Sequence, residues 1–94
     1  MNKEEARSVL HRALQEWRIK PYSELCSLLS RQETFELKGD SGMTYQLEIQ
    51  AVWDDEHKKH LRVMGSIDDG RGLAAFVPLT ENFIITPDGS FIGE

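Results

Sequence analysis

One ten-residue stretch, residues 44–53, alternates apolar with mainly polar side chains and has no interruption. A period of two is typical of a β-strand that has one face on a core and the other toward water. Because this is the longest such run in the chain, it predicts the central strand of a small antiparallel sheet. The side chains expected on the core face are Tyr45, Leu47, Ile49, Ala51 and Trp53.

The segment that precedes this strand predicts two helices. Over residues 3–18 apolar side chains recur at the spacing of one helical stripe, with Asn2 as a suitable N-cap and Pro21 as the stop. A second, shorter helix is predicted over residues 22–30. We expect the first helix to lie across one face of the sheet. Its apolar stripe consists of Ala6, Val9, Leu10, Ala13, Leu14 and Trp17.

A hairpin is predicted between the central strand and the residues just before it. The two are joined by a loop over residues 40–42, and Gly42 can adopt the left-handed conformation that a three-residue hairpin loop requires. This closure pairs Leu37 with Tyr45 and Phe35 with Leu47. All four apolar side chains then lie on one face, so the turn and the apolar pattern agree.

Alternation resumes over residues 61–68 and predicts the next strand. Gly65 falls opposite or near Ile49, where we expect the missing side chain to make room for a bulky helix residue such as Trp17. The continuous apolar run 73–77 predicts a further strand, which pairs with 61–68 if the intervening glycines form a turn.

Residues 83–92 predict a C-terminal hairpin closed by the turn Pro87-Asp88-Gly89-Ser90. Helices followed by strands on short turns are typical of an α+β fold. We therefore expect one or two N-terminal helices packed on a four- to five-stranded antiparallel β-meander. Residues 1–94 are expected to form a single domain.

Composition narrows the classes of function. The formal net charge is −5, from 11 basic and 16 acidic residues, which argues against nucleic acid as a partner. The sequence has no apolar run of a membrane span's length and no apolar core of a signal peptide. Cys26 is the one cysteine, so no internal disulfide is possible, which fits a reducing compartment. We expect a cytoplasmic protein, bacterial in style, that does not bind membranes.

Three segments carry side chains of the kinds used in catalysis or ligation. The charged loop 54–60 contains His57 and His60, but its two lysines repel a cation and the spacing is not that of a zinc site. Residues 68–72 lack the closing acid of a calcium loop and the lysine of a phosphate loop. Cys26 is expected to fill the core. We therefore predict no metal, no cofactor and no catalytic residues, and an enzyme is the less favoured class.

The face of the sheet away from the helices is the candidate interaction surface. The segment 73–77 has apolar side chains on both faces in either register, and the sequence leaves the register open. Either the C-terminal hairpin folds across these side chains, or a partner protein or second copy of the chain covers them. The candidate partner-binding residues are Val52, Met64, Leu73, Ala75, Phe76 and Val77.

The sequence therefore favours a small protein-binding module that acts through protein contact or self-association. An adaptor, or an acidic inhibitor of a basic protein in the manner of an immunity protein, is one concrete version. The alternative is a small enzyme or ligand carrier with a pocket between the helices and the sheet. A polar pocket lined by Tyr45, Trp17 or Trp53 would favour that alternative.

Overall fold

The computed structural model describes residues 2–69 and 78–94. Helix α1 spans Lys3–Arg18, as the stripe predicted. The Asn2 side chain caps it by accepting a hydrogen bond from the Glu5 backbone N–H at 3.1 Å, which satisfies one of the free donors at a helix start. The stripe is buried at Ala6, Val9, Leu10 and Leu14. Trp17, its last member, is only half-buried.

The predicted second helix is shorter and less regular than expected. It consists of one α-helical turn, α2 (Tyr22–Leu25), and a 3₁₀ turn, η1 (Cys26–Leu29). The Ser27 hydroxyl donates to the Glu24 carbonyl oxygen at 2.7 Å, and the Ser30 hydroxyl to that of Ser27 at 3.3 Å. Serine side chains that bond to nearby backbone in this way compete with a continuing helix.

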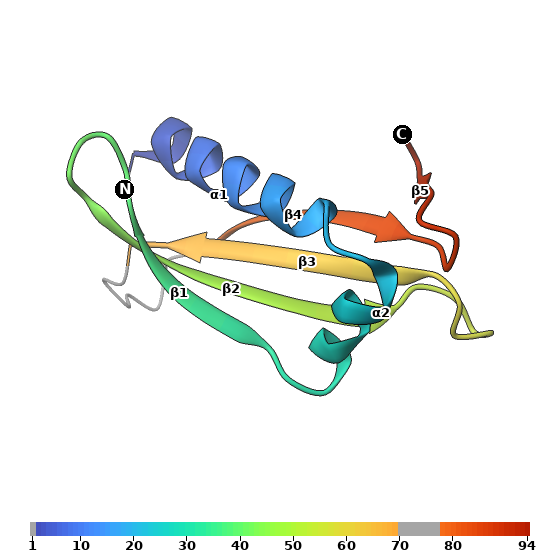
Figure 1. Cartoon of the computed structure of the whole chain (residues 1–94). Helices are drawn as coiled ribbons and strands as arrows, with labels where there is room; N and C mark the ends of the chain where they lie inside the picture. The colour runs from blue at the N-terminus through green and yellow to red at the C-terminus, as the bar shows by residue number, and fades with distance from the viewer. Residues whose placement is uncertain (1, 70–77) are drawn as a thin grey trace.

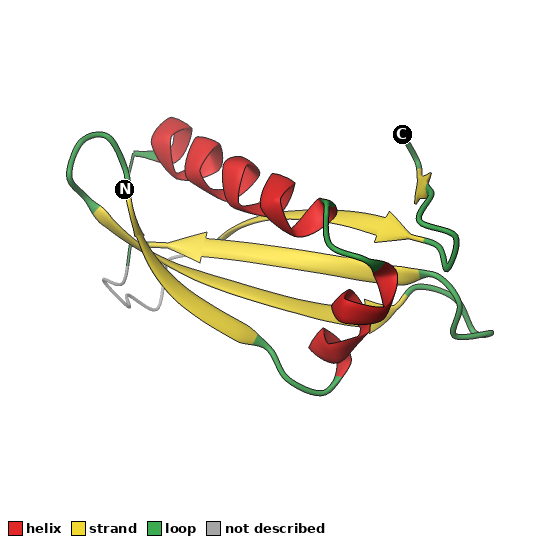
Figure 2. Ribbon diagram, in the orientation of Figure 1, coloured by secondary structure: helices red, strands yellow, loops and turns green. Residues whose placement is uncertain are grey.

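The five strands form one antiparallel meander in the order β1-β2-β3-β4-β5. Figure 1 shows α1 and α2 on the same face of this sheet, and Figure 2 shows the division into a helical layer and a strand layer. The architecture is the expected α+β fold. We call the face that carries the helices the helix face, and the other the open face. The strands are β1 (Glu33–Lys38), β2 (Thr44–Trp53), β3 (Leu61–Asp68), β4 (Leu79–Ile85) and β5 (Phe91–Ile92).

The hairpin of β1 and β2 has the predicted register. Leu37 lies opposite Tyr45, and Phe35 lies opposite Leu47. Gly42 has a φ of 88°, and its N–H donates to the Gly39 carbonyl oxygen at 2.9 Å. Only glycine adopts that φ without strain, so the position of Gly42 sets the register of the strands that it joins.

Gly65 lies opposite Ile49 as expected, but the residue above it is not Trp17. A Cβ atom at Gly65 would lie 3.0 Å from Leu10 Cδ1 and 3.2 Å from Leu14 Cδ2. Helix α1 therefore crosses β3 through its leucines, and the expected contact with Trp17 was wrong. Trp17 lies over β1 instead, with its ring centroid 6.0 Å from that of Phe35.

At the edge of β3 where residues 73–77 were expected to pair, β4 lies from Leu61 opposite Ile85 to Ile67 opposite Leu79. The segment 73–77 itself lies outside the described residues. The first half of β4 escapes detection by sequence because Glu81 stands at a helix-face position, opposite Gly65, and interrupts the apolar alternation.

The C-terminal hairpin does not fold across the open face. Strand β5 instead extends the sheet beside β4, with Ile92 opposite Ile84 and Phe91 opposite Ile85. Phe91 contacts Phe83 edge-on, with 5.8 Å between ring centroids. The aromatic side chains of this hairpin thus lie on the helix face. The hairpin therefore does not cover Val52 and Met64, which lie on the open face.

Candidate functional site

Helix α1 covers the helix face of β1 only in part. It packs on β3 and β4, while η1 packs on β2. Two apolar side chains of β1 consequently remain exposed on the helix face, Phe35 at 36% and Leu37 at 38%. Trp17 reaches toward them from the last turn of α1 and contacts Phe35. A strip of apolar surface therefore runs between the helix and the first strand.

Two hollows lie along this strip, one of about 260 Å³ beside Trp17 and Phe35 and a neighbouring one of about 170 Å³ beside Leu37. They share Ala13, Glu16 and Leu37, so they form one continuous depression. We call this depression the α1–β1 groove. Its residues are Val9, Arg12, Ala13, Glu16, Trp17, Lys20, Phe35, Leu37 and Lys38.

The charged residues of the groove are mainly basic, although the whole chain has a net charge of −5. Arg12, Lys20 and Lys38 line it, against the single acid Glu16. The Lys20 ammonium lies 5.1 Å from the centre of a Trp17 ring, within cation–π range, and also 3.3 Å from a carboxylate oxygen of Glu24. The groove therefore combines an apolar floor with a rim of three basic residues and one acid, and acids line the adjoining hollow that shares Val9 and Arg12 with it.

Beyond one end of the groove, the Glu5 carboxylate ties the start of α1 to the β1–β2 hairpin. It accepts hydrogen bonds from the Ser41 N–H at 2.8 Å, the Ser41 hydroxyl at 2.7 Å and the Tyr45 hydroxyl at 2.7 Å. The hydrogen bond from the Ser41 hydroxyl, followed by that from Tyr45, lowers the pKa of Glu5. Burial and the contact with Glu5 raise the pKa of Tyr45 to about 12.

Gly39 makes the approach of Glu5 to the hairpin possible. A Cβ atom at this position would lie 2.5 Å from the Glu5 carboxyl carbon, closer than such atoms pack. The sequence signalled Glu5 only as an acid in the first helical turn. Its bonds to Ser41 and Tyr45 connect positions 36 and 40 residues apart, and no local pattern announces them.

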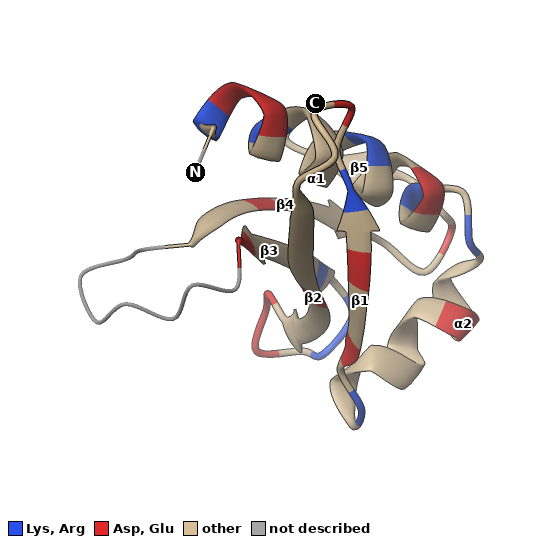
Figure 3. Ribbon diagram, turned by 90° about the vertical axis from the view of Figure 1, so that its left-hand side faces the viewer, with Lys and Arg blue, Asp and Glu red and all other residues tan. Residues whose placement is uncertain are grey.

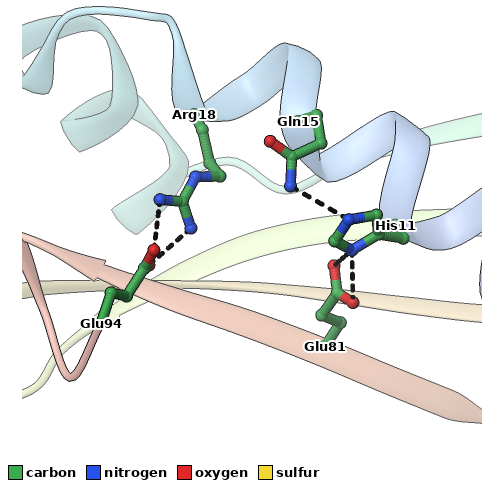
Figure 4. Close-up of polar contacts among 5 residues, drawn as sticks. All are labelled: His11, Gln15, Arg18, Glu81 and Glu94. Carbon is green, nitrogen blue, oxygen red and sulfur yellow. Dashed lines mark hydrogen bonds and ion pairs between the residues drawn. The ribbon is translucent and has the colours of Figure 1, made fainter.

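The opposite side of α1 is fastened to β4 and the C-terminal residues (Figure 4). His11 Nδ1 lies 3.0 Å from a Glu81 carboxylate oxygen. The Arg18 guanidinium donates to both carboxylate oxygens of Glu94, at 2.5 and 2.6 Å, and lies 4.0 Å from the centre of the Phe91 ring. These contacts hold the helix toward β4, and so they keep it away from β1.

The open-face surface that was predicted from the sequence has more polar neighbours than expected. Val52 is 44% exposed and Met64 is half-buried, both on the open face. Arg62 stands directly opposite Val52, with its guanidinium 2.6 Å from an Asp54 carboxylate oxygen and 2.7 Å from the Asn82 side-chain oxygen. The remaining predicted members, Leu73, Ala75, Phe76 and Val77, lie outside the described residues.

In the loop between β2 and β3, the Asp55 side chain accepts hydrogen bonds from the loop's own backbone. One Asp55 carboxylate oxygen accepts from the His60 N–H at 2.8 Å and the Lys59 N–H at 2.9 Å, and the first of these bonds is the main cause of the lowered pKa of Asp55. His57 is exposed and His60 half-buried. Across residues 2–69 and 78–94, no three His, Cys, Asp or Glu side chains gather to hold a metal ion.

Two further sequence candidates are Cys26 and the segment 68–72. Cys26 is half-buried and packs against the core. Of the segment 68–72, only Asp68 and Asp69 are described, so its turn lies outside the described part. Among the helices that the structure describes, none has the length and apolarity of a bilayer span.

Comparison of the chain with protein-family models, curated proteins and solved structures gives no match. The function is therefore inferred from the geometry of the groove and of the sheet.

Proposed function

We propose that this protein is a protein-binding module whose α1–β1 groove takes an apolar segment of a partner that also carries acidic residues. The observation that supports this most directly is the apolar strip in which half-buried Trp17 lies beside exposed Phe35 and Leu37. Aromatic side chains in a surface depression are typical anchors for a partner's side chains. The α1–β1 groove replaces the open face as the leading candidate surface, because its apolar residues are contiguous.

The chemistry of the groove favours a protein segment over a small substrate. Small-ligand sites combine enclosure with a few buried polar groups that orient the ligand. No charged or strongly polar side chain is buried in the part of the chain that the structure describes. Tyr45 is buried, but its hydroxyl is engaged by Glu5. An open apolar groove of this kind supports binding of side chains rather than catalysis.

The charge of the rim favours an acidic partner segment. Exposed ion pairs contribute only about 0.2–1 kcal/mol each, so apolar contact supplies most of the affinity. The charges of Arg12, Lys20 and Lys38 act mainly by steering association and selecting the partner. This preference is opposite to that of an acidic inhibitor docking on a basic protein.

The test is a selection of phage-displayed random peptides on the wild-type protein, followed by affinity measurements with the selected peptides. Leu37→Asp places a charge on the groove floor, and Val52→Asp is the matched control on the open face. Both side chains are exposed, at 38% and 44%, so both variants are expected to stay folded, as a thermal melt will check. Trp53→Phe leaves Trp17 as the single tryptophan reporter of binding.

We expect the selected peptides to carry large apolar residues next to acids. Their affinity should fall at least about tenfold in Leu37→Asp, because a desolvated charge then faces apolar side chains, and should be unchanged in Val52→Asp. The groove is refuted if no peptide is enriched, or if Val52→Asp abolishes binding while Leu37→Asp does not. The latter result would return the open face to first place.

A further inference from the structure

Strand β1 forms one edge of the sheet, and its outer backbone groups have no strand partner among the described residues. The Gly39 N–H donates to the Met43 carbonyl oxygen at 2.9 Å, so the backbone of every second residue before Gly39 faces β2. The N–H and C=O groups of Thr34, Glu36 and Lys38 therefore point outward. The opposite edge, β5, has only two residues.

An open edge of this length is a template for another strand. Natural edges are often blunted by charged side chains, and β1 carries such charges, seen as acidic bands and a basic end in Figure 3. Here, however, the charges of β1 are of both signs. Glu36 and Lys38 both lie on the open face, two residues apart, and Lys38 makes no ion pair in the described part of the chain.

We propose that β1 pairs with β1 of a second copy of this chain, antiparallel about a two-fold axis at Leu37. In this register Glu36 of each copy lies opposite Lys38 of the other. These two Glu36–Lys38 pairs, whose backbone groups point outward from the sheet, exchange about four backbone hydrogen bonds. Two opposite-charge cross-strand pairs form on the open face, and Leu37 meets Leu37 on the helix face.

The charges select this register from its neighbours. Only a two-fold axis that passes through a residue brings outward backbone groups together. An axis at Glu36 would place Glu36 against Glu36 of the second copy, which is repulsive. An axis at Phe35 would place Thr34 against Glu36 and leave both Lys38 side chains outside the strand pairing. The axis at Leu37 alone matches acid with base.

This self-association goes beyond the proposed function, since it uses the outer edge of β1 rather than the groove. The two surfaces share Lys38 and Leu37, whereas Glu36 does not line the groove. Glu36→Lys therefore separates them. It should prevent self-association and leave binding of the selected peptides unchanged, so the failure of one proposal is distinguishable from the failure of the other.

The test is sedimentation velocity over a concentration series at low salt, where ion pairs are least screened. Glu36→Lys and Lys38→Glu each set like charges opposite one another, so each alone should weaken self-association by about tenfold or more. An equimolar mixture of these two variants restores both opposite-charge pairs and should form a heterodimer. The double variant Glu36→Lys/Lys38→Glu should likewise recover the dimer. Arg7→Glu, an exposed charge reversal on α1, is the control and should associate as the wild type does.

A wild-type protein that stays monomeric throughout the series overturns the proposal. Single variants that associate as the wild type does would place the contact on another surface. A mixture of the two single variants that stays monomeric would refute the register.

Discussion

Gly65 and Leu14 are expected to be energetically coupled, since a side chain at Gly65 would enter the space that Leu14 fills. The added Cβ atom would lie 3.0 Å from Leu10 Cδ1 and 3.2 Å from both Leu14 Cδ2 and Ile49 Cδ1. Overpacking of this kind costs about 1–3 kcal/mol. Removing glycine's conformational freedom in a strand returns about 0.5–1 kcal/mol. We therefore expect Gly65→Ala to lower the free energy of unfolding by about 1 kcal/mol.

Leu14→Ala should cost more, about 2–5 kcal/mol, because the side chain is 1% exposed and its removal leaves a cavity. In the double variant the new methyl group at position 65 occupies part of that cavity. The double variant should therefore be more stable than the sum of the two single losses predicts, by about 1 kcal/mol. Urea denaturation measures all three losses, provided that the m-value is unchanged.

Ser66→Ala is the matched control, because Ser66 is the next residue of β3 and faces the open side. Its effect should add to that of Leu14→Ala within about 0.5 kcal/mol. The packing of α1 on Gly65 is refuted if Gly65→Ala is neutral or stabilising. It is also refuted if the two losses in the Gly65/Leu14 pair simply add.

Two further outcomes concern the ionisable groups. The pKa of Glu5 is lowered from 4.5 in the folded state, so its contribution to stability is complete above that pH and is lost as pH falls through the folded pKa. The stability difference between wild type and Glu5→Gln should hence shrink as pH falls below 4.5 in a series of thermal melts; a difference independent of pH contradicts this. Replacing His57 and His60 together by Ala should leave stability unchanged, and zinc should not raise the melting temperature; saturable zinc binding that the double variant loses would reverse that reading.

Much of the fold could be predicted because its signals are local. The alternation in β2 extends over ten residues, and Gly42 sets the register of the first hairpin. Asn2 caps the start of the first helix with its side chain, and Pro21 follows the end of that helix. In each case the residues that determine the structure are neighbours in the sequence.

The errors arise where a distant contact decides the outcome. Glu81 occupies a helix-face position in β4 and binds His11, 70 residues away. This acid interrupts the apolar alternation of the sequence, although the backbone pairing of β4 with β3 continues without a break. Trp17 belongs to the apolar stripe by spacing but lies at its margin.

The groove depends on the lateral position of α1 over the sheet. That position is held by Glu5 on the β1–β2 hairpin and by Arg18 on the C-terminal Glu94. The sequence showed apolar side chains at Phe35 and Leu37, but a helix placed a few ångströms closer to β1 would have buried them. No local pattern distinguishes these two arrangements.

The most direct test of the binding site is mapping of chemical shifts in the ¹⁵N-labelled protein as a selected peptide is added. We expect the largest changes at the Trp17 indole and at the amides of Phe35 and Leu37, with the open-face residues Val52 and Ile84 unaffected. Changes centred on Val52 and Ile84, with the Trp17 indole unmoved, would contradict this expectation.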